Sequence, residues 1–135
     1  MSGLILKLGP RERLLINGAV VENGERRTRL SIQTPNASIL RLRDAIHPED
    51  AVTPVRRLCY MAQLILSGDS AADDMRPRLL RGIEQLSQVL VDPDSRAQIG
   101  LATQSLMSGQ YYDTLRSLRR LLPREERLPA TARSQ

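Results

Sequence analysis

Residues 14–44 read LLINGAVVENGERRTRLSIQTPNASILRLRD, and this stretch decides the fold of the first part of the 135-residue chain. Residues 28–32 and 38–43 alternate between apolar and polar side chains, a period of two that is typical of a half-buried strand. The dipeptides Asn17-Gly18 and Asn23-Gly24 are tight-turn signals, because both central residues of a type I′ turn need positive φ. We therefore predict short antiparallel strands, with a hairpin at Asn23-Gly24.

The flanking sequence completes a β-rich module. Residues 4–8 form a short apolar run that ends at the turn signal Gly9-Pro10, and residues 13–16 and 19–22 supply two more short strands. Five short strands of this kind predict a small antiparallel barrel or sandwich within residues 1–50.

Residues 51–123 have the 3.6-residue spacing of amphipathic helices. Thr53-Pro54 predicts a helix start, because threonine is a good N-cap and proline suits the first helical position, and Gly68 predicts its end. Three more helices follow with short connections, so we expect an antiparallel bundle of about four helices and an α+β fold class. Residues 124–135 are expected to be a disordered tail.

Charge is concentrated in the β-rich half. Residues 1–43 hold eight basic and three acidic side chains, so they carry the whole net charge of +5 and the remainder balances to zero. Lys7 is the only lysine among the 20 basic residues. The planar fork of arginine suits bidentate contact with phosphate or guanine. An acidic polymer is one candidate partner, and a solvated surface in an arginine-rich protein is the alternative that composition leaves open.

The residues that often carry catalysis have structural explanations here. His47 is the single histidine and lies in a connector, and Cys59 falls at an apolar position of a predicted helix. Asp69, Asp73 and Asp74 flank a helix start, where negative charge complements the helix dipole. We predict a protein that is not an enzyme and needs no cofactor or metal.

The apolar runs are shorter than the roughly 20 residues that cross a bilayer, and the N-terminus does not have the pattern of a secretion signal. A single cysteine also fits a reducing compartment. These observations predict a cytoplasmic location without a membrane partner.

Several ordered blocks resemble one bacterial family. They are INGAVVENGERR at residues 16–27, Ile39-Leu40-Arg41 with Arg43-Asp44, Thr53-Pro54-Val55-Arg56-Arg57 with Tyr60, and GQYYDTL at residues 109–115. Together they resemble the flagellum biosynthesis repressor family FlbT over roughly residues 4–122. The chain departs from the family in the first turn, where Pro-Gly-Glu-Arg is usual and Gly9-Pro10-Arg11-Glu12-Arg13 stands here.

This resemblance implies a post-transcriptional regulator. It would bind the 5′ untranslated leader of flagellin mRNA and control translation and degradation of that message.

A fainter likeness concerns the order of the strands. Leu4-Ile5-Leu6 at the start, and Thr34-Pro35 followed by Arg43-Asp44, are similar in order to the carbon storage regulator CsrA, a five-stranded RNA-binding protein. The likeness implies RNA contact by the first and last strands, through Leu6, Lys7, Leu42 and Arg43.

We therefore expect RNA contact through ten residues of the β module: Leu6, Lys7, Arg11, Arg13, Arg26, Arg27, Arg29, Arg41, Leu42 and Arg43. Arg41 and Arg43 are the main candidates, because they occupy alternate positions of the last predicted strand and so lie together on its outward face. A structural explanation stays open for the others, since Arg11 and Arg13 can pair with Glu12.

The main competing hypothesis is a protein-binding module. The helices on either side of Gly109 resemble one helical-repeat hairpin, a unit that buries its face against a neighbour or a peptide. Tyr111, Tyr112 and Leu115 are then the candidate contacts for flagellin or another flagellar factor, in a chaperone-like protein that acts on the mRNA only indirectly. Packing inside the bundle is the other interpretation of these three residues. Edge strands in so small a module also predict a homodimer.

Overall fold

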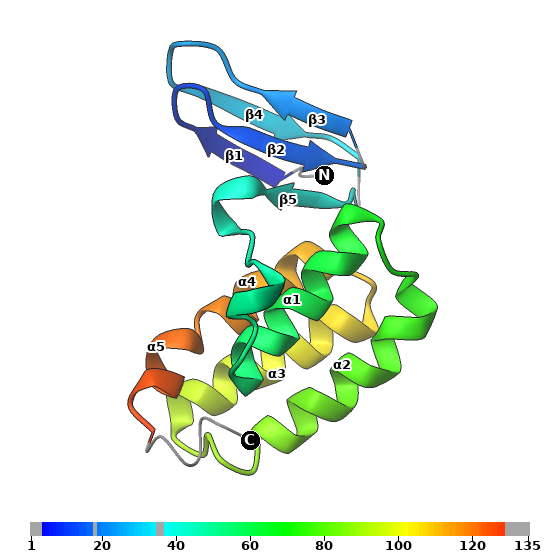
Figure 1. The fold of residues 1–135 in the computed structure, drawn as a ribbon, viewed down its shortest axis with the longest axis vertical. Coiled ribbons are helices and arrows are strands. Elements are labelled where there is room, and N and C mark those ends of the chain that lie inside the picture. The colour runs from blue at the N-terminus through cyan, green and yellow to red at the C-terminus, as the bar shows by residue number, and fades with distance from the viewer. Residues whose placement is uncertain (1–3, 18, 35–36, 129–135) are drawn as a thin grey trace.

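The computed structural model describes residues 4–17, 19–34 and 37–128, and it stacks a β module on a bundle of helices (Figure 1). The predicted α+β class and the order of its two parts are confirmed. Strand β5 is the strand nearest the helices in this view, so the β module rests on the bundle through one of its sheets.

The β module is an open sandwich of two antiparallel sheets. Its strands are β1 (Leu4–Leu8), β2 (Arg13–Ile16), β3 (Ala19–Glu22), β4 (Thr28–Ile32) and β5 (Ile39–Arg41). Strand β1 pairs with β4, and β2 lies between β3 and β5. An apolar layer that includes Leu6, Leu8, Leu14 and Ile39 fills the space between the sheets. No ladder among the described strands joins the two sheets, so the predicted alternative of a closed barrel is wrong.

The tight hairpin forms at a different Asn-Gly pair from the predicted one. Strands β2 and β3 pair in the register Ile16↔Ala19, with Asn17 at a φ of 50°, while Gly18 lies outside the described residues. Asn23 and Gly24 are both described, and neither has positive φ. The Asn23 side chain instead donates to the carbonyl oxygens of Gly9 and Arg26, at 2.7 and 2.9 Å. The pair therefore directs the chain from one sheet to the other, and the predicted hairpin at Asn23-Gly24 is wrong.

The first turn contains a residue other than glycine in the left-handed conformation. Glu12 N donates to Gly9 O at 3.2 Å, and Arg11 has a φ of 60°. A left-handed conformation favours glycine, and it costs a β-carbon-bearing residue about 1 kcal/mol. Arg11 therefore holds a conformation that its own side chain disfavours.

The last strand is shorter than predicted. It ends at Arg41, and a 3₁₀ turn, η1 (Leu42–Asp44), follows. The side chains of β5 are all buried, with Ile39 between the sheets and Leu40 against the helices.

Four long helices follow a second 3₁₀ turn, η2 (Pro48–Asp50): α1 (Pro54–Ser67), α2 (Ala72–Leu86), α3 (Pro93–Met107) and α4 (Tyr111–Arg119). The predicted start and end of α1 are confirmed, because Thr53 Oγ1 accepts from Arg56 N at 3.3 Å and Gly68 has a φ of 85°. Asp92 caps α3 by accepting from Ser95 N at 3.0 Å.

Helix α1 contacts α2 and α4, and α3 contacts the same two helices, so the four enclose one leucine-rich core. Each such buried leucine contributes about 2 kcal/mol through the surface it removes from water. No described helix is long and apolar enough to cross a membrane.

A fifth helix, α5 (Leu122–Glu126), lies where a tail was predicted. Glu125 is 3% exposed, and its Oε2 accepts from Val55 N in the first turn of α1 at 2.8 Å. The expectation of disorder is therefore wrong for residues 124–128, and residues 129–135 lie outside the described residues. Sequence alone does not reveal this contact, because it joins residues 70 positions apart.

Candidate nucleic-acid interface

Arg41 is the centre of a buried ion pair. Its Nε donates to Glu12 Oε2 at 2.7 Å, and its NH2 group donates to Glu12 Oε1 at 2.8 Å and to Lys7 O at 2.7 Å. The two side chains are only 9% and 8% exposed. Arg41 shares a face of β5 with Ile39, which points between the sheets, so it reaches across to β1. The prediction that Arg41 points outward is wrong.

This pair changes the acidity of Glu12. The hydrogen bonds from Arg41 lower the pKa of Glu12 from 4.5 to about 2, with a further contribution from the Gly9 amide and in spite of burial. Glu12 therefore stays ionised and holds Arg41 in place. Arg43 lies 3.6 Å from the same carboxylate, with a side chain that is 61% exposed.

A basic groove of about 350 Å³ lies between β1 and α4. Its lining residues come from β1, from the end of β5 and the turn after it, and from α4: Leu4, Ile5, Leu6, Arg41, Arg43, Tyr112, Arg116, Arg119 and Arg120. Five of these nine residues are arginines and none is acidic, so the groove favours anions. Ile5, which is 57% exposed, and Tyr112 add apolar surface between the guanidinium groups.

Three of these arginines are not among the residues that the sequence predicted to contact RNA. Arg116, Arg119 and Arg120 recur at the i, i+3 and i+4 positions of one face at the end of α4, where positive charge also complements the helix dipole. Arg116 lies 3.7 Å from Asp113 and 5.8 Å from the centre of the Tyr112 ring. Their spacing was visible in the sequence, but a net charge of zero over the helical half concealed it.

A second basic groove, of about 540 Å³, continues along β1. It is lined by Lys7, Leu8, Gly9, Pro10, Arg27, Thr28, Arg29 and Arg43. Arg43 lines both grooves, and β1 supplies residues to each. We call the two together the basic track.

Lys7 and Arg29 stand directly opposite each other in the β1–β4 ladder, and both are exposed. Like charges at directly opposed positions destabilise a sheet. A phosphate placed between the two cations would offset that repulsion.

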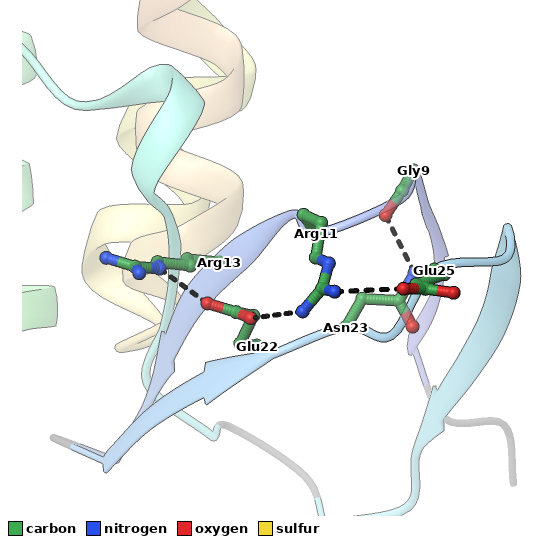
Figure 2. A network of polar contacts seen from close by, with 6 residues as sticks. All are labelled: Gly9, Arg11, Arg13, Glu22, Asn23 and Glu25. Carbon is green, nitrogen blue, oxygen red and sulfur yellow. Dashed lines mark hydrogen bonds and ion pairs between the residues drawn. The ribbon is translucent and has the colours of Figure 1, made fainter.

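Arg11 and Arg13 belong to a different surface, shown in Figure 2. Arg13 Nε donates to Glu22 at 2.8 Å, while Arg11 donates to Glu22 at 3.4 Å and to Glu25 at 3.1 Å. These contacts lower the pKa of Glu22, with the Arg13 hydrogen bond as the largest cause. Neither arginine lines the basic track. The alternative explanation predicted that these two arginines pair with Glu12. They pair with Glu22 and Glu25 instead.

The remaining residues of the β module that were predicted to contact RNA differ in how exposed their side chains are. Leu6 is 3% exposed and belongs to the core between the sheets, although it lies at the wall of the first groove. Leu42 is 38% exposed in η1, and Arg26 is exposed in the loop before β4 but lines neither groove. The basic track thus gathers Leu6, Lys7, Arg27, Arg29, Arg41 and Arg43 from the ten predicted residues.

The three residues predicted to bind protein are involved in packing. Leu115 is 2% exposed within the helical core. Tyr111 is half-buried, and its hydroxyl oxygen accepts from an Arg76 NH2 group at 2.6 Å. Tyr112 contacts both apolar cores and so joins the β module to the bundle. The prediction that Leu115 contacts a partner is therefore wrong, and the alternative of packing inside the bundle holds for it.

Side chains with catalytic potential are dispersed. Cys59 is fully buried, and burial raises the pKa of its thiol to about 12. His47 is exposed at the start of η2. Across residues 4–17, 19–34 and 37–128, no three histidine, cysteine or acidic side chains gather as a metal site.

These features define a class of protein in which a small β sandwich and a helical bundle together present an arginine-rich surface. The family described as "Flagellar protein FlbT" matches residues 4–128, and this chain belongs to that family. The predicted family is therefore confirmed.

Named relatives cover nearly the whole chain. A "Probable flagellum biosynthesis repressor protein FlbT" of Rhodopseudomonas palustris (strain TIE-1) is 35% identical over 93% of this chain and 96% of its own length. Proteins of the same name from Chelativorans sp. (strain BNC1) and Caulobacter sp. (strain K31) are 31% and 29% identical, over 96% and 91% of this chain and 87% and 93% of their own lengths. No solved structure matches this chain.

Proposed function

We propose that this protein represses flagellar synthesis after transcription, by binding the 5′ untranslated leader of flagellin mRNA and controlling its translation and degradation. The observation that carries the proposal is the basic track, in which arginines from β5, η1, α4 and the loop before β4 meet along β1. The names of the relatives support the flagellar part of the proposal. The choice of mRNA leader rests on the resemblance described at the outset.

The chemistry of the basic track suits a single RNA strand. Arginine forks bind phosphate oxygens in bidentate fashion, and the like-charged pair of Lys7 and Arg29 gains most from a phosphate between them. Ile5 and Tyr112 offer apolar surface to an unstacked base. In this role the protein binds RNA and catalyses no reaction itself, and it acts in the cytoplasm where the message is translated.

A gel shift with the flagellin leader RNA tests this proposal with matched variants. The first variant, Arg116→Gln with Arg120→Gln, removes two exposed charges from the basic track. The control, Arg11→Gln with Arg13→Gln, removes two exposed charges from the carboxylate network of Figure 2. Arg41 is left unchanged, because its loss would expose Glu12 and disturb the fold.

We expect the first variant to bind about tenfold more weakly, since each exposed ionic contact contributes roughly 0.5–1 kcal/mol. The slope of log affinity against log salt should also fall by about 0.7 for each lost phosphate contact. The control should bind as the parent protein does. Equal losses in the two variants, or the absence of a shift at low salt with intact RNA, would refute direct binding through the basic track.

A further inference from the structure

A third groove lies between α1 and α2 and has apolar side chains along its floor. It measures about 750 Å³, with Leu58, Met61 and Leu86 among its lining residues and with Arg78 and Arg81 also lining it from α2. Val89, just after α2, lies at one end and is 45% exposed.

Gly82 lies where α1 and α2 approach each other closely. A β-carbon at Gly82 would lie 2.4 Å from Leu58 Cδ2, so the Leu58 side chain lies directly against the α2 backbone. Because position 82 has no side chain of its own, the Leu58 side chain can occupy the space beside the α2 backbone there. The base of the groove is therefore the seam between the two helices, with Leu58 and Leu86 buried there and Met61 half-buried beside them.

The length of the groove matches a short helix. On α2 the lining runs from Arg78 to Leu86, about 12 Å at 1.5 Å per residue, and Gln88 and Val89 extend it beyond the end of the helix. The i, i+4 and i+7 anchors of an amphipathic helix span about 10 Å, so two to three turns fit lengthwise.

The charge of the groove favours an acidic helix over a basic one. The charged lining residues are Arg57, Arg78 and Arg81, and the lining contains no carboxylate. Arg78 and Arg81 are exposed, one helical turn apart on the same face. A helix that sets leucine-like side chains on the floor and carries acidic residues along its flank satisfies both the apolar and the cationic parts.

We propose that the groove between α1 and α2 is the docking site for an acidic amphipathic helix of a protein partner. RNA is the poorer occupant, because the apolar residues Leu58, Met61 and Leu86 between the arginines offer no hydrogen-bond donor to a phosphate that lies over them. The groove shares no lining residue with the basic track, so this proposal stands independently of RNA binding.

Fluorescence anisotropy with two helix-stabilised peptides tests the proposal on the full chain. The first peptide carries leucine at every third or fourth position with glutamate on both flanks, and the second has lysine in place of glutamate. The Val89→Glu variant should weaken binding of the glutamate peptide at least tenfold. Leu101→Glu is the control, because Leu101 is also 45% exposed but lies on α3 outside the groove.

Charge reversal supplies the second measurement. Arg78→Glu combined with Arg81→Glu should lose the glutamate peptide and bind the lysine peptide, which a merely misfolded variant would not do. Failure of the parent protein to bind the glutamate peptide saturably below about 1 mM would overturn the proposal. Two other results would also overturn the proposal, because each assigns the groove to another occupant. The first is competition of single-stranded RNA with the peptide, if Val89→Glu abolishes that competition. The second is self-association of the protein, if Val89→Glu abolishes it.

Discussion

Replacing Glu12 by glutamine tests the ion pair that holds the basic track in shape. The change keeps the size of the side chain but leaves the Arg41 guanidinium, 9% exposed, without a carboxylate in the bidentate position. The lowering of the Glu12 pKa from 4.5 to about 2 corresponds to about 3 kcal/mol. Removing one partner of a buried pair costs about 3–5 kcal/mol in other proteins. We expect the free energy of unfolding to fall by about 3 kcal/mol at pH 7.

The stabilisation by the ion pair should depend on pH, and its direction follows from the lowered pKa of Glu12. The folded-state pKa of Glu12 lies below its unfolded value, so the stabilisation is fully present above about pH 4.5 and is lost as the pH falls toward 2. The parent protein should therefore lose its advantage over the variant in acid, to about 1 kcal/mol near pH 3. Urea denaturation followed by circular dichroism at both pH values measures the difference.

Glu22→Gln is the matched control, because Glu22 also accepts from two arginines but in the exposed network of Figure 2. It should change stability little. Removing both charges of the buried pair, by Glu12→Leu with Arg41→Met, should recover much of the loss. Equal destabilisation by Glu12→Gln and Glu22→Gln, or a deficit in Glu12→Gln that does not change with pH, would show that the buried pair does not contribute as described.

Four further outcomes follow from the packing. Leu115→Ala should lower the free energy of unfolding by about 3 kcal/mol in urea, because it empties a buried site; unchanged stability would make Leu115 a surface residue. A chain that ends at residue 123 should unfold more readily by about 2 kcal/mol than one that ends at residue 128, because only the longer chain satisfies the first turn of α1; equal stability would contradict the contact. Arg11→Gly should raise the melting temperature by relieving about 1 kcal/mol of left-handed strain, and a lower value would mean that its ion pairs dominate. Cys59 should resist alkylation in the native protein at pH 8 and react once the chain is unfolded in urea; rapid native labelling would contradict its burial.

Local signals predicted most of the fold. Thr53, Pro54 and Gly68 specify the ends of α1 because capping depends only on neighbouring residues. The alternating residues of β4 likewise appear as a strand. These features are encoded within a few residues, so a single sequence is enough to find them.

Long-range pairing was harder to predict. Both Asn-Gly dipeptides satisfy the same turn rule, and only the partner of β4 distinguishes them. Because β4 pairs with β1, the chain must cross between sheets at Asn23-Gly24, where the Asn23 side chain replaces the hairpin contacts. The hairpin was misplaced because the sequence pattern does not state which strands meet.

The sequence predicted the part of the basic track that the β module supplies, but not the part that α4 supplies. Arg27, Arg29 and Arg43 were identified from the charge pattern of the β strands and Lys7 from the likeness to CsrA, and the four do gather along β1. The contribution of α4 requires the two halves to be in contact, and periodicity within each half does not establish that contact. The predicted exposure of Arg41 failed because alternation assigns a side chain to a face of a strand without saying what covers that face.

The bond between Glu125 and Val55 also has a consequence during protein synthesis. The ribosome releases Val55 long before Glu125, which is made 70 residues later. Strands β1 to β5 are complete by residue 41, so the sandwich can assemble on the nascent chain while the first turn of α1 still has an unpaired amide. The helical bundle therefore reaches its final form only after Glu125 has been made, and a product truncated before that residue would carry a β module with an unfinished bundle attached.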